Sequence, residues 1–347
     1  MNTQSTTRYP TAYYQALPKV DLHRHLEGSL RLSTLLDIGR SHGLPLPGTG
    51  KLRELVQVSG GDVYNFENFL SKFQTLRMFY RSPEAIHRIT REAIQDAALD
   101  NVRYLELRFT PVALSRAEGF PLAEVIDWVV TAAREAAAEY HIQTSLIVSM
   151  NRQESLQLGA EVVQLAAERL GRGIVGIDLA GSEATHQGVD FAGLFREARQ
   201  AGLHITAHAG EWGGPENVRS AIEVLGAERI GHGVRVLEDP AVLRLARERQ
   251  VVFEVCVTSN YQSGVVPSLV VHPLSRMLNL GLNATINTDD PSISQIRLSD
   301  EYRLVCEDLG LSQEALSNRV AAAARAAFLP AAEKAALVRE IARPAVR

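Results

Sequence analysis

The chain has 347 residues, of which 46% are hydrophobic and 22% are charged, so it is long enough to bury a large core. Its formal net charge of −4 provides no broad positive field for nucleic acid phosphates, and we expect no nucleic acid partner. The longest apolar runs, such as 142–150 and 251–257, are far shorter than the roughly 20 residues of a membrane-spanning helix, so we expect no membrane partner.

The two cysteines, Cys256 and Cys306, are too few for a disulfide framework. They also exclude a site of four thiolates that would hold zinc or an iron–sulfur cluster. A reducing cytoplasm is therefore the expected compartment. The polar N-terminus carries no apolar segment of the kind found in secretory signals, so we expect a short arm over about residues 1–16.

Short apolar runs that alternate with helical segments predict eight strands. In chain order these runs are 20–23, 102–109, 143–148, 174–179, 204–208, 229–232, 251–257 and 283–287. Ser82-Pro83 and Asp239-Pro240 each place a capping residue before a proline at the first position of a helix. Strands that alternate with helices pair in parallel, and runs rich in Val, Ile and Leu suit strands covered on both faces.

Eight such units predict an α/β fold, a closed (β/α)₈ TIM barrel, with a doubly wound open sheet as the alternative. No linker or low-complexity tract divides the chain, so we expect a single domain over residues 1–347. Residues 30–100 carry mostly helical signals, which predicts extra helices after the first strand. Within them, residues 63–80 either form an apolar gate over a site or pack on the barrel as an amphipathic helix.

Polar residues gather at the predicted strand ends, where barrels of this kind carry their chemistry. His23 and His25 lie at the end of the first strand and, as alternate residues, point to the same face. Strand five ends in His208, strand six ends in His232, and Asp289 follows strand eight. A lone His-x-His is more often a pair of structural polar residues than a metal site, but four of ten histidines at strand ends make that reading improbable.

Three histidines and one carboxylate suit a divalent metal ion, with zinc preferred over iron or manganese. We expect one Zn²⁺ per chain, with the ligands His23, His25, His208 and Asp289. A bound zinc lowers the pKa of its water from about 15.7 to about 7, and nearby His232 and Asp289 can take the proton. Glu211 is then left to act as a general acid. The combination predicts metal-assisted hydrolysis.

Two further positions can contact a substrate. Asp290 follows Asp289 where the chain turns, so one carboxylate can hold metal while the other holds substrate; the alternative is an Asp-Asp-Pro turn that caps a helix. Gly181 lets a ligand approach the backbone closely, or is a plain turn glycine. Cys256 has no basic neighbour in the sequence, so we expect a packed core thiol with no catalytic role.

Six segments in this order resemble the adenosine deaminase family of the amidohydrolase superfamily: LPKVDLHRHLEGSL, IDLAGSE, HAGEWGG, ERIGHGVR, CVTSN and NTDDPSI. The resemblance extends from about Leu17 to the FLPAAEKAAL segment near the C-terminus. It implies a zinc-containing (β/α)₈ barrel that deaminates the purine 6-position. Adenosine and 2′-deoxyadenosine would become inosine and 2′-deoxyinosine, with release of ammonia, in purine salvage.

The resemblance also implies a role for each matched residue. The metal ligands are again His23, His25, His208 and Asp289, and His25 is expected to contact the substrate as well. Glu211 matches the proton donor to purine N1, and His232 matches the residue that orients or deprotonates the attacking water. Asp290 matches a contact on the purine N7 side, and Gly181 matches a backbone contact at N3.

Glu27 departs from the pattern, because many adenosine deaminases have Asp at this position, which matches a contact to the ribose 5′-hydroxyl. The extra methylene shifts the carboxylate and can favour a different group beyond the purine. Glu at this place resembles adenine deaminases and aminodeoxyfutalosine deaminases, whereas Gly231 and the HAGEWGG segment resemble the nucleoside-type members. Val257 also stands where many relatives have Pro. Adenosine and 2′-deoxyadenosine therefore rank first, and adenine, aminodeoxyfutalosine and methylthioadenosine stay open.

Two functions from other classes are alternatives. A metallohydrolase acting on a non-purine amide or ester would share the metal ligands but would not need Glu211 and Asp290. A catalytically silent binding barrel would have broken ligands, whereas every matched position here holds a competent residue. We expect the partner to be a small-molecule purine nucleoside.

Overall fold

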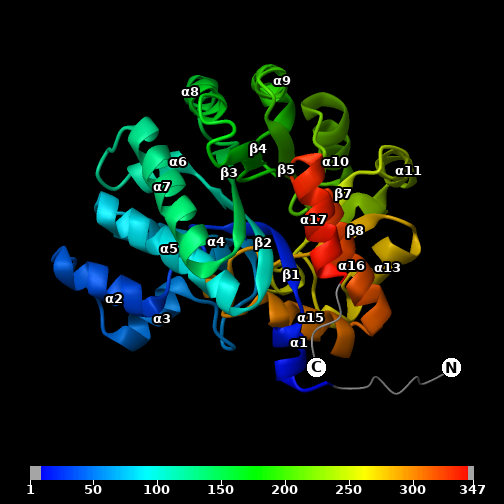
Figure 1. The fold of residues 1–347 in the computed structure, drawn as a ribbon, viewed down its shortest axis with the longest axis horizontal. Coiled ribbons are helices and arrows are strands. Elements are labelled where there is room, and N and C mark those ends of the chain that lie inside the picture. Colours follow the sequence, from blue (N-terminus) through cyan, green and yellow to red (C-terminus); the bar gives the residue numbers. More distant parts are fainter. Residues whose placement is uncertain (1–8, 343–347) are drawn as a thin grey trace.

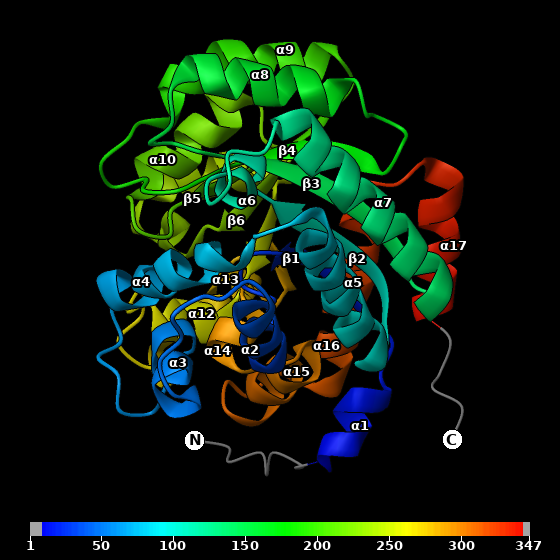
Figure 2. The same ribbon diagram turned by 90° about the vertical axis from the view of Figure 1, so that its left-hand side faces the viewer.

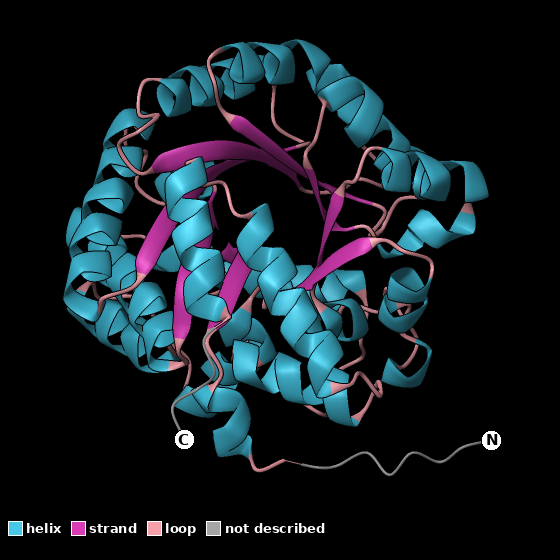
Figure 3. Ribbon diagram, turned by 45° about the vertical axis from the view of Figure 1, so that its right-hand side comes forward, coloured by secondary structure: helices cyan, strands magenta, loops and turns pink. Residues whose placement is uncertain are grey.

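The computed structural model describes residues 9–342 (Figure 1). Eight strands form one parallel sheet in which each strand pairs with the next one in the chain. The strands are β1 (Lys19–His25), β2 (Val102–Phe109), β3 (Gln143–Asn151), β4 (Ile174–Ala180), β5 (His204–Ala209), β6 (Arg229–His232), β7 (Val252–Val255) and β8 (Asn283–Ile286). Figure 3 shows them surrounded by helices. The predicted (β/α)₈ barrel is confirmed, and the doubly wound sheet is wrong.

The barrel is nearly closed, because β1 and β8 meet only at their carboxyl ends. The backbone N–H of Asp289 donates to the carbonyl of His23, and that of His25 donates to the carbonyl of Asp289, each at 2.8 Å. The backbone N–H of Leu22 donates to Oδ1 of Asn287 at 2.9 Å. Closure of the barrel therefore depends on the segments that carry the predicted metal ligands.

Helices connect the strands and cover the outside of the barrel. The α-helices before β5 are α1 (Thr11–Ala16), α2 (Leu32–Ser41), α3 (Thr49–Val56), α4 (Phe66–Leu76), α5 (Pro83–Leu99), α6 (Pro111–Ser115), α7 (Leu122–Tyr140), α8 (Leu156–Ala167) and α9 (Ala192–Gln200). Those after β5 are α10 (Pro215–Ser220), α11 (Pro240–Glu248), α12 (Val257–Gln262), α13 (Leu274–Asn279), α14 (Pro291–Ser294), α15 (Leu298–Glu307), α16 (Gln313–Ala326) and α17 (Ala331–Ile341). Short helical turns are η1 (Arg77–Phe79), η2 (Gly188–Phe191), η3 (Ala221–Leu225), η4 (Val234–Glu238) and η5 (Leu269–Val271). No helix in the described part of the chain is long and apolar enough to cross a membrane.

Between β1 and β2 the chain forms α2, α3, α4, η1 and α5 in succession. Figure 2 shows α2, α3 and α4 lying together on one side of the barrel. The predicted N-terminal arm contains helix α1 in its described part, and its residues 1–8 lie outside the described residues. The predicted arm is therefore helical over Thr11–Ala16.

Local signals explain several element boundaries. The side chain of Ser82 accepts from the backbone N–H of Ala85 at the start of α5, and Asp239 caps α11 in the same way, as predicted. The predicted strand over residues 251–257 is too long, because β7 ends at Val255. The carboxylate of Glu301 accepts from the backbone N–H groups of Val257 and Thr258, which turns the chain into α12.

Two apolar clusters hold the layers together. The large one fills the space between the sheet and the surrounding helices. A smaller one packs Val20, Leu22 and Tyr104 of the first two strands against alanines of α16 and Leu337 of α17. The rigid barrel leaves the carboxyl ends of the strands to carry functional groups.

Candidate active site

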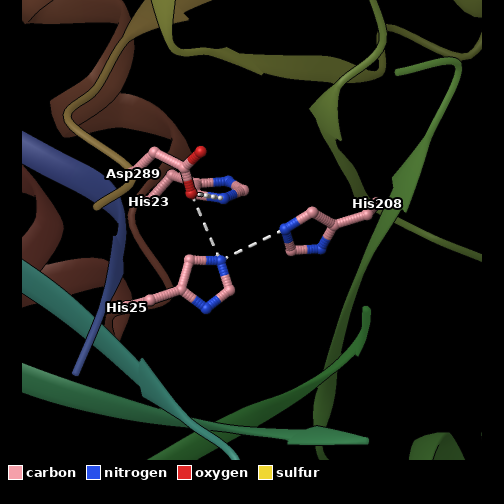
Figure 4. Close-up of side chains that lie close together, drawn as sticks. All are labelled: His23, His25, His208 and Asp289. Carbon is pink, nitrogen blue, oxygen red and sulfur yellow. Dashed lines mark hydrogen bonds and ion pairs between the residues drawn. The ribbon is translucent and has the colours of Figure 1, made fainter. Parts of the chain in front are cut away.

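The four predicted metal ligands converge at the carboxyl ends of the strands (Figure 4). His23 and His25 project from β1, His208 projects from β5, and Asp289 follows β8. One possible ligand atom from each residue lies within 4.8 Å of the other three. The Nε2 atoms of His25 and His208 are 3.2 Å apart, and Oδ1 of Asp289 lies 3.2 Å from Nε2 of His23. Segments distant in sequence thus form one candidate metal centre.

Buried carboxylates set the tautomers of two of these histidines. Nδ1 of His23 lies 2.8 Å from Oε2 of Glu254, and Nδ1 of His208 lies 3.1 Å from Oδ1 of Asp178. Because an ionised carboxylate can only accept, each Nδ1 donates its proton and each Nε2 keeps a lone pair. Nε2 of His23 is buried without a hydrogen-bond partner among the described residues. Lone pairs that converge in this way fit a divalent metal ion.

Two arginines in the barrel interior keep these carboxylates ionised. Arg108 places Nη2 2.7 Å from Oε2 of Glu254 and Nη1 3.5 Å from Oδ1 of Asp178, and Arg229 donates to Oε1 of Glu254 at 2.6 Å. Burial alone would raise the pKa of Glu254, but the charges of Arg108 and Arg229 outweigh it and hold that pKa well below its usual range. At Asp178, burial is likewise outweighed by His208 and Arg108, which lower its pKa. Both carboxylates therefore orient their histidines as acceptors.

Glu211 stands on the loop after β5, and a second carboxylate holds that loop in place. Glu183 is 2% exposed and accepts from three consecutive backbone N–H groups, those of Gly210, Glu211 and Trp212. Burial, together with the charges of Asp289 and Glu183, raises the pKa of Glu211 well above its usual range. A carboxyl that keeps its proton near neutral pH is what the predicted general acid requires.

Hydrogen bonds that pass from α13 to β6 set the tautomer of His232. The backbone N–H of Leu274 donates to Nδ1 of His272 at 3.2 Å, and burial lowers the pKa of His272 to about 4. The neutral His272 ring therefore carries its proton on Nε2 and donates it to Oδ1 of Asn260 at 3.3 Å. Nδ2 of Asn260 then donates to Nδ1 of His232 at 3.1 Å. Burial lowers the pKa of His232 well below its usual value, so its neutral ring carries the proton on Nε2.

The Nε2–H of His232 faces the candidate metal centre. Nε2 lies 3.6 Å from Oε2 of Glu211 and 3.8 Å from Oδ2 of Asp289. The backbone φ values of His232 and Asp289 are +60° and +68°, a conformation uncommon outside glycine and often found at functional sites. A ring in this tautomer can donate a hydrogen bond to water but cannot accept a proton at Nε2. The geometry favours orienting the water over deprotonating it.

A second group of possible metal ligands consists of His232, Cys256 and Asp289. Cys256 is fully buried, and burial with the charge of Asp289 raises the pKa of its thiol well above the usual value. A thiol that stays protonated is a poor metal ligand. Cys256 is thus a buried thiol, as expected, and the group with three histidines is the stronger candidate.

The four predicted substrate contacts line the same cavity: His25, which is also a candidate metal ligand, and Glu27, Gly181 and Asp290. Gly181 has φ +89°, a conformation that strains any residue with a side chain, and a Cβ there would also lie 3.1 Å from the backbone nitrogen of Arg152. Oδ1 of Asp290 is buried without a partner in the described chain, and burial with the charge of Asp289 raises the pKa of Asp290 well above its usual value. Oε1 of Glu27 accepts from the backbone N–H of Thr110 at 2.6 Å, whereas Oε2 has no described partner. Unpartnered buried atoms beside a cavity are available to a ligand.

The cavity has a volume of about 250 Å³ and an apolar cover. The cover consists of Phe66, Phe69, Leu70 and Phe73 of α4 and of Trp212. The ring centroids of Phe66 and Trp212 are 4.4 Å apart, which joins α4 to the loop that carries Glu211. Residues 63–80 thus contain a helix whose apolar face lines the cavity, and opening and closing of this helix stay a prediction.

Known proteins are similar to this chain in sequence and in fold. A family model described as Adenosine deaminase matches residues 18–344. The chain belongs to the adenosine deaminase family. The adenosine deaminase of Klebsiella pneumoniae (strain 342) is 38% identical over 331 residues, which cover 94% of this chain and 98% of that protein. The adenosine deaminase of Erwinia tasmaniensis is 40% identical over 325 residues, which cover 92% and 97%.

Solved structures of similar proteins share the whole barrel. An adenine deaminase from Arthrobacter aurescens superimposes with a TM-score of 0.86 at 29% identity, over 94% of this chain and 98% of that one. The Arabidopsis protein ADAL, in complex with GMP, superimposes with a TM-score of 0.85 at 28% identity, over 95% of this chain and 98% of that one. A zinc-bound amidohydrolase from Burkhoderia ambifaria superimposes with a TM-score of 0.86 at 27% identity, over 97% of this chain and 95% of that one.

Membership of the adenosine deaminase family makes the chain an enzyme, a hydrolase acting on C–N bonds. The residues that orient the candidate ligands and the loop of Glu211 were not among the residues predicted from the sequence. Glu254, Asp178 and Arg108 lie within runs predicted to be covered on both faces, and charged residues are almost never fully buried unless they are paired. That signal could have marked them as buried charges that need a partner, but it does not say which residues they pair with. Glu183 and Asn260 lie within the IDLAGSE and CVTSN segments, but their partners are distant in sequence.

Proposed function

We propose that this adenosine deaminase family member is a zinc-dependent enzyme that converts adenosine and 2′-deoxyadenosine to inosine and 2′-deoxyinosine, with release of ammonia. One observation carries the proposal. The candidate metal centre, the carboxyl of Glu211 and the Nε2–H of His232 all border one cavity. Hydrolysis at a purine 6-position needs a nucleophilic water, an acid at N1 and a donor that holds the water, and these groups can supply all three.

The metal would be held by His23, His25, His208 and Asp289. A donor set of three imidazoles and one carboxylate suits zinc, whereas magnesium and calcium prefer oxygen ligands throughout. When bound, zinc supplies a Lewis acid that lowers the pKa of a coordinated water from about 15.7 to about 7. The zinc-bound amidohydrolase of similar fold supports this choice of metal.

The chain's own residues would move the protons. Glu211 donates its proton to N1, which draws electron density from C6 as the water oxygen attacks that carbon. His232 donates a hydrogen bond to the attacking oxygen, and Oδ2 of Asp289 accepts a proton from it. That proton passes to the leaving amino group, and Glu211 recovers a proton from the new hydroxyl as the C–N bond breaks. The products are a 6-oxopurine with a proton on N1, ammonia, and the enzyme in its starting state.

Two groups would fix the orientation of the purine. Burial keeps the pKa of Asp290 raised, so its carboxyl can donate a hydrogen bond to N7, which is an acceptor. The backbone beside Gly181 can approach N3 closely because no side chain intervenes. In this orientation the 6-amino group would lie at the candidate metal centre, and the N9 substituent, on the other side of the purine, would point away from it.

Other 6-aminopurines are the alternative substrates. A relative of similar structure is named an adenine deaminase, and Glu27 stands where the sequence pattern favours adenine or aminodeoxyfutalosine. Adenosine and 2′-deoxyadenosine rank first because HAGEWGG and Gly231 resemble the nucleoside-type members.

We also propose a reducing cytoplasmic location. It is supported by the two described thiols, which are free and buried.

A deamination panel tests the proposed function. Purified enzyme is given adenosine, 2′-deoxyadenosine, adenine, methylthioadenosine and aminodeoxyfutalosine, and ammonia release is measured before chelation, after chelation and after zinc is added back. Preference for the two nucleosides, lost on chelation and restored by zinc, supports the proposal. Preference for another member of the panel reassigns the substrate, and no turnover of any purine by zinc-loaded enzyme would contradict the reaction itself.

A further inference from the structure

The helical face that covers the cavity ends in a cation. Phe66, Phe69, Phe73 and Arg77 follow one another at intervals of three or four residues, and all four line the cavity. Residues at this spacing share one face of a helix, so Arg77 continues the apolar face of α4 into η1. Among the described lining residues, Arg77 is the only lysine or arginine.

Arg77 forms no ion pair with a carboxylate among residues 9–342. Its Nε is buried without a hydrogen-bond acceptor. Nε of Arg81 is buried without an acceptor as well, but Arg81 has a carboxylate partner, Glu118 at 2.7 Å, and so has Arg31, which lies 2.6 Å from Asp96. Arg77 differs because it lines the cavity, where its donors are available to a ligand.

Two more polar atoms near Arg77 also lack described partners, namely Oε2 of Glu27 and the hydroxyl of Tyr80. Both groups are close enough to Arg77 for its charge to act on them. Thr110 holds Glu27 through Oε1 and leaves Oε2 free. Glu27 and Arg77 both line the cavity, so their unpartnered atoms, with the hydroxyl of Tyr80 nearby, indicate a polar ligand group at this place.

We propose that this part of the cavity binds an anionic oxygen group, a carboxylate or a phosphate, carried on the N9 substituent of the purine substrate. The inference rests on the proposed function, which directs that substituent away from the metal centre. The planar guanidinium of Arg77 binds either anion through two parallel N–H···O hydrogen bonds. Oε2 of Glu27 accepts a hydroxyl of the same substituent. The inference keeps the proposed reaction but changes the ranking of substrates, because an acidic 6-aminopurine nucleoside is then preferred to adenosine and 2′-deoxyadenosine.

Steady-state kinetics of the zinc-loaded full chain test this inference. The substrates are adenosine, adenosine 5′-monophosphate and adenosine with a 5′-carboxylate, and the enzymes are wild type, Arg77→Gln, Arg77→Lys and the matched control Arg81→Gln. The wild type is expected to prefer one of the two acidic substrates over adenosine by about 10-fold or more in kcat/KM. Arg77→Gln is expected to lower kcat/KM for that substrate about 10- to 100-fold and for adenosine by less than about 3-fold.

Further readouts distinguish a phosphate from a carboxylate ligand, and failure of this inference from failure of the proposed function. The two acidic substrates distinguish phosphate from carboxylate, and Arg77→Lys is expected to retain part of the preference because it keeps the charge without the planar fork. Raising the ionic strength is expected to weaken the preference in wild type and not in Arg77→Gln. Two results overturn the inference and leave the proposed function standing. One is a wild type that prefers adenosine. The other is an Arg77→Gln variant that loses all three activities equally while Arg77→Lys shows no preference. Inactivity of wild type on all three substrates overturns both the inference and the proposed function.

Discussion

Replacement of Glu183 by Gln tests how the loop that carries Glu211 is held in place. Oε1 of Glu183 accepts from the backbone N–H groups of Glu211 and Trp212, and Oε2 accepts from the N–H of Gly210 at 2.8 Å and from Nδ2 of Asn217 at 3.2 Å. Glutamine keeps one accepting oxygen and presents an NH₂ group to the other set of donors. At least one buried N–H then loses its acceptor.

The expected cost follows from that one lost acceptor. An unsatisfied buried donor costs about 1–3 kcal/mol of stability. In a large chain about 1 kcal/mol corresponds to about 2 °C, so the melting temperature of Glu183→Gln should be lower than that of wild type by roughly 2–6 °C. A displacement of Glu211 by about 1 Å is enough to lower kcat by about 100-fold. Zinc content should not change, because Glu183 touches none of the four candidate ligands.

The assay compares the melting temperature, zinc content, kcat and KM of Glu183→Gln with those of Glu216→Gln. Glu216 lies in the first turn of α10, directly after that loop, and accepts from the backbone N–H of Gly214. It is exposed, so its replacement should change stability by less than about 0.5 kcal/mol. A larger fall in kcat than rise in KM is expected for Glu183→Gln, because protonation of N1 belongs to the transition state. Wild-type kcat in this variant would refute the role of Glu183 in placing Glu211.

Three further changes probe other parts of the site and the fold. Asp178→Asn weakens the acceptor behind Nδ1 of His208 and should lower zinc affinity about 10-fold, measured by competition with a chelator; unchanged affinity contradicts the tautomer assignment. Asn260→Asp places an acceptor where Nδ2 now donates to Nδ1 of His232, which reverses the tautomer of that ring. The kcat of Asn260→Asp should therefore fall by roughly 100-fold or more, and further than the kcat of Asn260→Leu. Equal losses of kcat in the two variants contradict the tautomer assigned to His232. Burial raises the pKa of Glu301 from 4.5 to about 7, so the folded state holds a proton that stabilises it below about pH 4.5 by roughly 3 kcal/mol, and this contribution is lost as the pH rises through about 7. The melting temperature of wild type should therefore fall more than that of Glu301→Gln between about pH 5 and about pH 8, and parallel curves contradict the pKa of Glu301.

Strand positions were predictable because the apolar pattern that marks a strand is local. The predicted runs 102–109 and 229–232 coincide with β2 and β6. The end of β7 was not predictable, because the chain turns where Glu301 accepts the backbone N–H of Val257, 44 positions earlier. A contact of that separation leaves no periodic signal in the residues around Val257.

The positions of the candidate ligands were predictable because a parallel barrel brings all strand ends to one face. His208 and Asp289 could be placed together without knowledge of any side-chain contact. The groups behind them could not, because each depends on a pairing between different strands. Arg108 and Glu254 are 146 positions apart, and only the closed barrel brings their side chains within 2.7 Å.

Replacement of Glu211 by Gln removes the proposed acid and leaves the four candidate metal ligands in place. Glu211→Gln is expected to bind one zinc ion per chain, like wild type, and to lose kcat for the preferred 6-aminopurine by about 100-fold or more, because the amide cannot donate a proton to N1. Zinc content and turnover are measured on the same preparation. Near-normal turnover by the zinc-loaded variant would contradict the assignment of Glu211 as the acid and, with it, the proposed mechanism of deamination.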